Sequence, residues 1–237
     1  MSIDLESLNR AFQALLPARA SGALDWAPQD PVFSYPEEAA QVEDAAPKRQ
    51  AEFLGGRICA RNAMAALGLP ECAILNDSDR VPLWPEGVVA SISHCRGLCG
   101  AVVASSEHYL GLGLDIERTN RLSDSARQRV MHANEAARAG KDLQAHGSLL
   151  FSAKEAFYKT QYRLFGASPA FHDLQLLVDF NAGQLSVLDA SGLAPELGNA
   201  ARKMQFRFCL VDELVLTVCW LSKGSEDTMK PKSLQSA

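Results

Sequence analysis

Apolar residues recur along the chain at two different spacings, and these spacings predict where helices and strands lie. Repeats at helical spacing predict helices over residues 5–15, 48–67 and 148–165. Shorter apolar runs, some of them alternating with polar residues, predict strands. These strands are expected at residues 88–93, 100–104, 111–117, 174–179, 184–189, 205–210 and 215–221. Helices and strands are therefore mixed along the chain, and the first two strands are expected to share one sheet.

Polar and proline-rich segments separate these elements. Residues 27–47 contain four prolines and several acidic side chains, so we expect a long solvated loop there. Residues 72–89 have the composition of loops and turns. Residues 118–141 are polar and are expected to be helical. The residues from Lys223 onward are polar, and we expect a disordered tail.

Composition and charge narrow the class of protein. With 237 residues, the chain is long enough for one large domain or two small ones. Hydrophobic residues make up 47% and charged residues 22%, which is ordinary globular composition and excludes intrinsic disorder, a collagen-like repeat and a coiled coil. The 23 Lys and Arg residues against 28 Asp and Glu residues give a net charge of -5. General binding of nucleic acid or anionic membranes is therefore disfavoured, and an anionic ligand must meet a local cluster of positive charge.

The six cysteines are expected to be buried free thiols, because most lie in apolar runs and six are too few for a disulfide scaffold in a chain this long. No Cys-x-x-Cys pair supports a zinc site. The first residues lack the basic and apolar regions of a signal peptide. No apolar run reaches the length of about 18 residues that spans a membrane. A cytoplasmic protein is the simplest expectation.

Two acidic side chains, Asp115 and Glu117, end one of the expected strands. Because side chains alternate along a strand, both carboxylates lie on one face and Ile116 points to the other. Two like charges side by side repel each other, and a hard cation such as Mg²⁺ would offset that repulsion. A solvated strand end without a metal is the plainer alternative.

The expected helix over residues 148–165 has one polar face. Glu155, Tyr158, Lys159 and Tyr162 fall on that face, opposite an apolar one. Glu155 and Lys159 are four residues apart, and such pairs are common on surface helices. By itself, this pair indicates no function.

Other candidate residues allow both a functional and a structural interpretation. His94 follows Ser93 at the end of a strand, where a lone histidine is more often structural than functional. Arg57 and Arg61 are four residues apart on one helical face, so their charges repel unless an anion lies between or opposite them. A solvated basic face is the alternative. No Gly-x-Ser-x-Gly motif supports a serine nucleophile.

Five segments follow one another in a fixed order along the chain. They are Arg57-x-x-x-Arg61, Pro82-x-x-Pro85, Ser91-Ile92-Ser93-His94, Gly113-Leu114-Asp115-Ile116-Glu117 and Phe151-Ser152-x-Lys154-Glu155-x-x-x-Lys159. Each segment is a weak signal, but the ordered set resembles the 4′-phosphopantetheinyl transferases. The resemblance is closer to the surfactin-synthetase type, and within it to the enterobactin-synthetase component D branch. It covers about residues 45–165, roughly half of the chain.

The resemblance implies a fold and an activity. The fold is α/β (α+β), with two similar halves related by a pseudo-twofold axis and the active site in the cleft between them. We expect an N-terminal half over residues 1–108, a C-terminal half over 109–222 and a tail over 223–237. The activity is transfer of 4′-phosphopantetheine from coenzyme A to a serine of an apo carrier protein, with adenosine 3′,5′-bisphosphate as the second product. Phosphoryl transfer of this kind depends mostly on positioning and charge neutralisation.

The resemblance also implies catalytic roles. Asp115, Glu117 and Glu155 match the family's ligands for Mg²⁺, with Mn²⁺ as an alternative. Lys159 matches a lysine that contacts the phosphates, so the expected catalytic residues are Glu155, Lys159 and Asp115. The base for the serine proton is Glu155 or a second acid, either Glu117 or Glu135, and the sequence does not choose between them.

Several residues are implied to bind coenzyme A, most of them basic. They are Arg57, Arg61, Arg80, Ser93, His94 and Lys159. Ser93 and His94 match residues that contact its phosphates. Arg57 and Arg61 are expected at the 3′-phosphate, and Arg80 is expected near the nucleotide.

The implied partner, a carrier protein, has an acidic surface around its modified serine. Residues 118–141 form a basic stretch in this acidic chain, and its six basic and two acidic residues give a local charge of +4. They are Arg118, Arg121, Arg127, Arg129, Arg138 and Lys141 against Asp124 and Glu135. We expect the carrier protein to dock there and the enzyme to be a monomer.

Two other functions remain open. A non-catalytic module that binds coenzyme A or a carrier protein would have little reason to keep Asp115, Glu117, Glu155 and Lys159 together. An unrelated Mg²⁺-dependent phosphate hydrolase would explain the acids but not the ordered motifs. The sequence does not say whether the carrier serves fatty acid, polyketide or peptide synthesis, although the component D likeness favours siderophore or other secondary metabolism.

Overall fold

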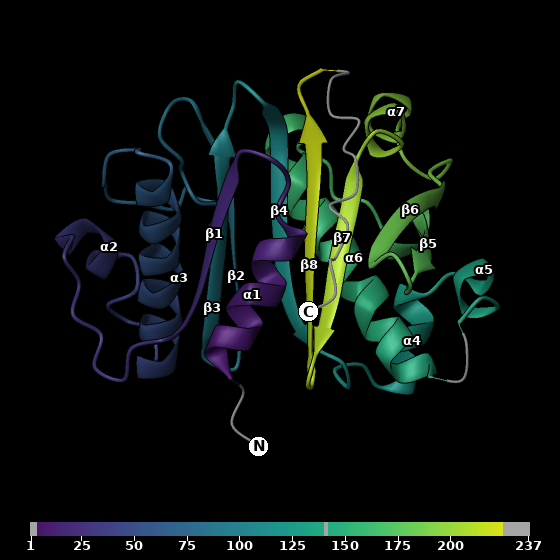
Figure 1. Ribbon diagram of the computed structural model, residues 1–237, viewed down its shortest axis with the longest axis horizontal. Coiled ribbons are helices and arrows are strands. Elements are labelled where there is room, and N and C mark those ends of the chain that lie inside the picture. Colours follow the sequence, from purple (N-terminus) through teal and green to yellow (C-terminus); the bar gives the residue numbers. More distant parts are fainter. Residues whose placement is uncertain (1–3, 140–141, 225–237) are drawn as a thin grey trace, which may run out of the picture.

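Two antiparallel sheets form the centre of the structure, a computed structural model that describes residues 4–139 and 142–224 (Figure 1). The smaller sheet has the strand order β1-β3-β2, with β1 at Ala20–Trp26, β2 at Val88–Cys95 and β3 at Leu98–Ser105. The larger sheet has the order β4-β8-β7-β6-β5. Its strands are β4 (Tyr109–Arg118), β5 (Gln175–Asp179), β6 (Gln184–Asp189), β7 (Gln205–Val211) and β8 (Leu214–Ser222). The expected strands and the α/β class are confirmed.

Helices cover both sheets. They are α1 (Leu5–Leu15), α2 (Pro36–Ala40), α3 (Pro47–Ala66), α4 (Asp124–Val130), α5 (Ala133–Ala136), α6 (Leu143–Phe165), the short η1 (Phe171–Asp173) and α7 (Pro195–Ala201). Helix α3 packs on the smaller sheet, and α6 packs on β4 and β8 of the larger one. Helix α1 lies on the side of the larger sheet opposite α6 and contacts both sheets (Figure 1). The expected division after residue 108 falls in the turn between β3 and β4; it stays a prediction, as does the pseudo-twofold relation.

The ends of α6 follow from its sequence. Asp142 accepts a hydrogen bond from the backbone N–H of Ala145 and so caps the N-terminus. Gly166 takes the left-handed conformation that ends many helices, with φ at +60°, and its N–H bonds the carbonyl of Tyr162. The helix is therefore longer than its apolar repeat predicts, because the cap at residue 142 lies before the first motif residue.

Glycines on β4 let α6 lie directly against the sheet. A Cβ atom at Gly113 would lie 2.0 Å from the carbonyl oxygen of Ala156 and 2.5 Å from Oγ1 of Thr160. A Cβ atom at Gly111 would lie 2.3 Å from the carbonyl oxygen of Thr160. Backbone atoms at these distances cannot move aside easily. This close approach sets the height of α6 above β4, and hence the distance from α6 side chains to Asp115.

The expectation of a solvated loop over residues 27–47 is wrong in part. Residues 36–40 form α2, and Glu38 is completely buried although it stands in an acidic, proline-rich segment. Its Oε1 accepts from Arg61 Nη1 at 2.7 Å and from the backbone N–H of Ile74 at 2.8 Å. A carboxylate can be buried when a cation and hydrogen bonds compensate it. The partner lies 23 residues away, so composition could not reveal it.

Other elements also depart from the expectation. Residues 118–141, expected to be helical, form the two short helices α4 and α5 with other backbone around them, and His132 caps the start of α5. Residues 140 and 141 lie outside the described residues, as does the expected tail from residue 225 onward. Strand β1 and helix α7 were not expected, since their sequences are rich in alanine and glycine and carry weak patterns.

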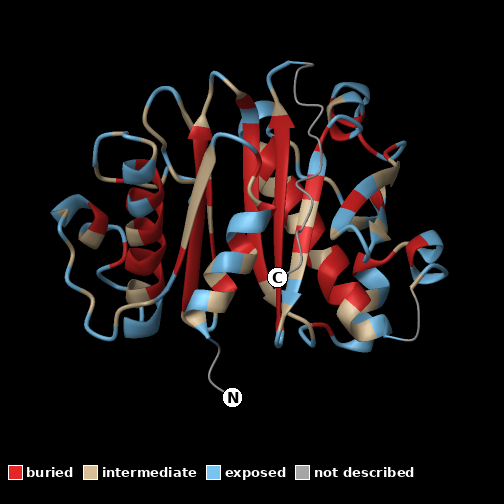
Figure 2. Cartoon of the chain, viewed as in Figure 1, coloured by how far each residue is buried: buried red, intermediate tan, exposed pale blue. Residues whose placement is uncertain are grey.

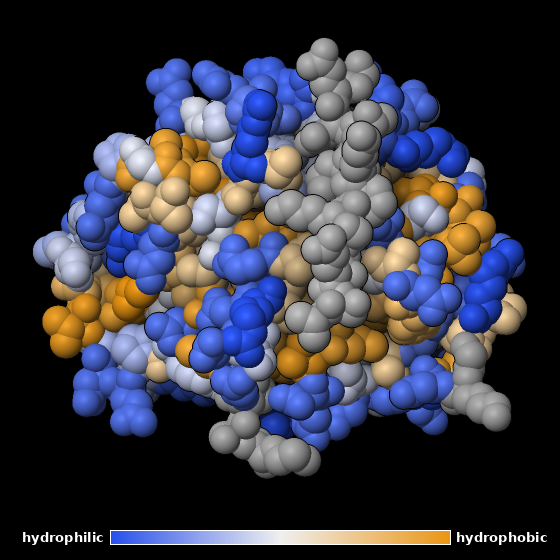
Figure 3. Space-filling model, in the orientation of Figure 1, coloured by the Kyte–Doolittle hydropathy of each residue, from blue (hydrophilic) through white to orange (hydrophobic). Residues whose placement is uncertain are grey.

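Buried residues follow the central strands and the sheet-facing sides of α3 and α6 (Figure 2). The face in Figure 3 is mostly hydrophilic, with separate hydrophobic groups between the charged side chains. All six cysteines are free, as expected, but only Cys59, Cys99 and Cys219 are buried, and the other three are partly exposed. Over the residues that the structure describes, no helix combines the length and hydrophobicity needed to cross a bilayer.

Adding one methyl group at Gly113 tests the packing of α6 on β4. We expect Gly113→Ala to lower the free energy of unfolding by about 3 kcal/mol, because the Cβ meets helix backbone. Gly147→Ala is the matched control on α6, since the atoms nearest its new Cβ belong to the side chains of Arg127 and Met131 and not to backbone. That change should be neutral or slightly stabilising. Urea unfolding followed by circular dichroism measures both, and equal effects would contradict the packing argument.

Candidate active site

Asp115, Lys159 and Ser93 meet where the two sheets adjoin. Lys159 Nζ, from α6, donates to Asp115 Oδ1 on β4 at 2.8 Å, to the Leu114 carbonyl at 2.9 Å and to Ser93 Oγ on β2 at 3.1 Å. Ser93 Oγ also accepts from the backbone N–H of Ile116 and donates to Asp115 Oδ1, both at 3.2 Å. One ammonium and one hydroxyl therefore fix β2, β4 and α6 relative to one another.

Two further carboxylates, Glu117 and Glu155, lie within the field of Asp115. Burial raises the pKa of Glu117 to about 7, and the charge of Asp115 adds to the shift. Arg121 Nε, 2.9 Å from Glu117 Oε1, opposes it. Burial also raises the pKa of Glu155, again with Asp115 as the next cause. Ionising both side chains is costly here unless a cation compensates them.

These carboxylates suit a cation that is also coordinated by atoms of a bound ligand and by water. Asp115 Oδ2 is buried and has no hydrogen-bond partner among the described residues, so its lone pairs are available. Within residues 4–139 and 142–224, no group of three or more His, Cys, Asp or Glu side chains is arranged to hold a metal ion by itself. Mg²⁺ is usually held by one or two carboxylates together with substrate phosphates and water. The residues present therefore fit Mg²⁺ as part of a complex with a phosphate-bearing ligand.

A cavity of about 300 Å³ opens beside Lys159, and we call it the seam cavity. One wall comes from α3, β2 and the loop after α3, and the other comes from α6. Its basic lining residues are Arg49, Arg57, Arg80, His94, Lys159 and Arg163. Glu52 and Asp79 are its acidic lining residues. The acidic chain thus concentrates positive charge at one hollow, as an anionic ligand requires.

Arg57 reaches the seam cavity from a buried position. Its guanidinium lies 3.4 Å from the centre of the Phe53 ring and donates to the Ile74 carbonyl at 3.2 Å and to Asn76 Oδ1 at 2.7 Å. Burial lowers the pKa of Arg57 to about 10, so the side chain stays charged at neutral pH. Its orientation is fixed before any ligand arrives. Arg80, by contrast, is exposed and takes a positive φ of 63° at the turn before Pro82.

Two residues implied to bind coenzyme A, Arg61 and Ser93, do not line the seam cavity. Arg61 pairs with Glu38 and lies 3.7 Å from Glu71. An anion was expected between or opposite Arg57 and Arg61. For Arg61, that anion is the Glu38 carboxylate of the protein itself. The Ser93 hydroxyl forms hydrogen bonds with Asp115, Lys159 and the backbone N–H of Ile116. Ser93 therefore connects β2 with β4 and α6.

Several lining residues were not among those that the resemblance implied to bind coenzyme A. Arg49 Nη1 lies 2.9 Å from His94 Nε2. The rings of Tyr158 and Tyr162 are 5.1 Å apart and form part of the α6 wall. Arg49 precedes Arg57 by eight residues, a little over two helical turns, and this spacing agrees with their place in one basic cluster of the sequence.

Glu135, one of the candidate bases, is buried in a separate network. Its Oε2 lies 2.8 Å from Lys154 Nζ and accepts the His132 N–H, and its Oε1 accepts the Leu176 N–H. Lys154 also donates to the Val130 and Phe171 carbonyls. With 1% of its surface exposed, Glu135 cannot meet a serine of another protein. The structure therefore removes Glu135 from the candidate bases.

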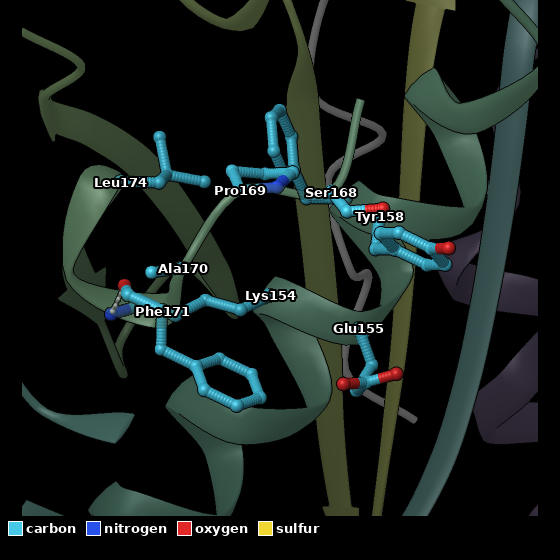
Figure 4. Close-up of a pocket in the computed structure, with 9 residues that line it drawn as sticks. Lys154, Glu155, Tyr158, Ser168, Pro169, Ala170, Phe171 and Leu174 are labelled. Carbon is cyan, nitrogen blue, oxygen red and sulfur yellow. Dashed lines mark hydrogen bonds between the residues drawn. The ribbon is translucent and has the colours of Figure 1, made fainter. Parts of the chain in front are cut away.

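A second hollow of about 250 Å³ lies on the other side of Glu155, and we call it the loop cavity. α6 forms one side and residues 168–174 form the other. Figure 4 shows that Lys154 extends to the loop at Phe171, whereas the Glu155 carboxylate points away from it. Tyr158 lines both the loop cavity and the seam cavity, so the two hollows flank one short stretch of α6.

Comparison with protein families agrees with this geometry. Residues 37–104 match a model described as the 4′-phosphopantetheinyl transferase N-terminal domain. Residues 111–219 match the 4′-phosphopantetheinyl transferase superfamily. The chain belongs to the 4′-phosphopantetheinyl transferases. The resemblance inferred from the ordered motifs is confirmed, and the protein is an enzyme of this family.

Individual relatives extend over most of the transferase. It is 42% identical over 178 residues to 4′-phosphopantetheinyl transferase Svp of Streptomyces mobaraensis, covering 72% of each chain. It is 30% identical to 4′-phosphopantetheinyl transferase Npt of Nocardia iowensis, over 87% of this chain and 97% of the relative. It is 29% identical to enterobactin synthase component D of Salmonella typhimurium, over 83% of each chain.

The raised pKa of Glu117 predicts how the stability of the metal-free transferase depends on pH. A carboxyl whose pKa is higher in the folded than in the unfolded state stabilises the fold at low pH, and this contribution is lost as pH rises through about 7. Glu117→Gln removes the titrating charge. We expect the variant to have a higher Tm than the unchanged protein at pH 8 and a similar Tm at pH 5, measured by scanning calorimetry in chelator. A lower Tm at pH 8 would contradict the assignment.

Proposed function

We propose that this transferase moves 4′-phosphopantetheine from coenzyme A to a serine of an apo carrier protein in a reaction that requires Mg²⁺. One observation carries the proposal: a cation-lined cavity opens beside Lys159 and Asp115, next to two carboxylates whose ionised forms need compensation. Phosphates and a divalent cation together satisfy both sets of charges.

The nucleotide and phosphates of coenzyme A occupy the seam cavity. Arg57 and Arg80 suit the 3′-phosphate and the nucleotide, and Arg49, His94 and Lys159 suit the pyrophosphate, because all of them line the same hollow. Guanidinium groups match phosphate oxygens in pairs, which favours arginine in such sites. We do not assign Arg61 to coenzyme A, because its guanidinium already forms a buried ion pair with Glu38.

Asp115 and Glu117 would hold Mg²⁺ (or Mn²⁺), and Glu155 would either complete the ligand set or serve as the base. When bound, the cation would neutralise charge on the pyrophosphate. Arg121 Nε lies 2.9 Å from Glu117 Oε1, so this arginine would compete with the ion for that oxygen. Titration with Mn²⁺ separates the two roles of Glu155. If Glu155→Gln keeps Mn²⁺ affinity and loses turnover, the carboxylate is the base; loss of both makes it a ligand.

The transfer step forms one bond and breaks another. The serine oxygen bonds to the β-phosphorus of coenzyme A, and the bond from that phosphorus to the leaving 3′,5′-bisphosphate oxygen breaks. If Glu155 is the base, the serine proton goes to its carboxylate, and burial raises the pKa of Glu155, which makes it a better proton acceptor than an ordinary carboxylate. Lys159 faces the phosphates and steadies the charge that develops on the leaving group.

The loop cavity offers a place for the pantetheine arm. Tyr158 separates it from the seam cavity, and Glu155 lines it. A ligand with its phosphates at Lys159 can therefore extend past Tyr158 toward residues 168–174. Its wall contains Phe157, Pro169, Phe171 and Leu174, which suits a long chain of modest polarity.

One assay tests transfer against the two other functions that the sequence left open, a non-catalytic binding module and a phosphate hydrolase. The transferase is incubated with coenzyme A, Mg²⁺ and an apo carrier protein, and the carrier is weighed by mass spectrometry. We expect a mass gain of one phosphopantetheine and no transfer by Asp115→Ala. Binding without transfer would support the module, and release of inorganic phosphate alone would support the hydrolase. Full activity of Asp115→Ala would remove Asp115 from the site.

Helix α4 supplies a testable docking surface for the acidic carrier protein. Arg129 is exposed there, whereas Arg127 lies 2.8 Å from Asp124 and contacts Gln144. Lys141, part of the same basic stretch, lies outside the described residues. Charge reversal at Arg127 and Arg129 should raise the KM for the carrier about tenfold and weaken its salt dependence, with kcat unchanged.

Arg129→Glu alone is the cleaner variant, because Arg127 also has an internal partner. Steady-state kinetics at two salt concentrations measures the effect, and Arg202→Glu on the far α7 side serves as the control. An unchanged KM in both Arg129→Glu and the double variant would place the carrier elsewhere. A monomeric state and a cytoplasmic location remain part of the proposal.

A further inference from the structure

His94 is held between a basic and an acidic side chain at the wall of the seam cavity. Its Nε2 lies 2.9 Å from Arg49 Nη1, and its Nδ1 lies 3.4 Å from Glu52 Oε2. The Glu52 side chain is 10% exposed, whereas the His94 side chain is 35% exposed. Both partners come from α3, one turn apart. His94 therefore has Nε2 against an arginine and Nδ1 against a nearly buried carboxylate, and all three side chains line the seam cavity.

The partners define which nitrogen carries the proton. An arginine side chain can only donate, so Nε2 of a neutral imidazole must accept from Arg49. The single ring proton is then on Nδ1, which faces the Glu52 carboxylate. A carboxylate in this place fixes the tautomer and the orientation of a histidine ring.

A phosphate oxygen that enters the cavity changes the partner of Nε2. The oxygen is an acceptor, so Nε2 can contact it only after taking up a proton from solvent. The ring then becomes an imidazolium with one N–H toward the phosphate and the other toward Glu52. Arg49, which no longer has an acceptor on the ring, is free to donate to the same anion.

We propose that Glu52 is a positioning residue that orients His94 and stabilises its imidazolium form when coenzyme A binds. The inference rests on the proposed function, which supplies the phosphate. The other charged groups that face His94 are Arg49 from α3, Lys159 from α6 and Asp115 from β4. Burial lowers the pKa of His94, with Arg49 and Lys159 acting in the same direction, and Glu52 is the first group that opposes them.

The proposal predicts a change in coenzyme A affinity that is opposite in direction to the change expected from charge alone. By Coulomb's law alone, neutralising a carboxylate beside an anion site should tighten the binding of an anion. If Glu52 acts through His94, Glu52→Gln instead weakens binding, because the imidazolium loses its counter-charge. The weakening should be about tenfold near neutral pH, in the range of one lost charge-assisted contact. It should shrink at low pH, where His94 is protonated before coenzyme A binds.

Calorimetric titration of the full chain with coenzyme A, at pH values from about 5.5 to about 8.5, tests this. Glu43→Gln removes the same charge from an exposed position outside the cavity and should bind like the unchanged protein. In a His94→Gln background, Glu52→Gln should have no further weakening effect. Unchanged or tighter binding by Glu52→Gln, or equal weakening with and without His94, would overturn the inference.

Nitrogen NMR of the histidine rings tests the same point on the unchanged protein, without relying on a variant that might unfold. We expect a neutral Nδ1–H tautomer for His94 in the free enzyme and an imidazolium in the complex. A neutral ring in the complex would refute the role of Glu52 and leave the transfer reaction standing. Absence of any coenzyme A binding by the unchanged protein would instead contradict the proposed function itself.

Discussion

The contact of Lys159 with Asp115 and Ser93 is the interaction on which the rest of the site depends. It joins side chains from α6, β4 and β2, and these elements belong to parts of the chain that are 66 residues apart at their most distant. The bare glycines of β4 bring α6 near enough for the lysine to reach. Packing therefore comes first, and the electrostatics of the site follow from the distance that it sets.

Acidic and basic side chains near this contact form separate groups, although the protein as a whole is acidic. The arginines and His94 line the seam cavity together with Lys159, whereas Asp115, Glu117 and Glu155 do not line it. A ligand that carries both phosphates and a divalent cation can satisfy each group at once. Two other ion pairs of the same chain stabilise the fold and do not face a ligand. They are Arg61 with Glu38 and Lys154 with Glu135, and both pairs are buried.

Local signals predicted much of this structure, because helix and strand periods are set by neighbours in the chain. The period-two placement of Asp115 and Glu117 and the polar face of α6 could be read in this way. The burial of Glu38 could not, since it depends on a distant arginine and a backbone N–H. Lys154 and Lys159 belong to one sequence motif, but Lys154 stabilises the loop at Phe171, whereas Lys159 lines the seam cavity. This difference in role becomes visible only in the fold. Glu52 gave no signal, because its role depends on the orientation of His94.

The central claim is that Ser93 and Lys159 act as one unit across the junction of the two sheets. A double-mutant cycle with Ser93→Ala and Lys159→Met, read as the single-turnover rate of phosphopantetheine transfer, tests it most directly. If the serine acts by holding the lysine on Asp115, the double variant is no slower than Lys159→Met alone. If the two losses multiply, the residues act independently and the account of the site is wrong.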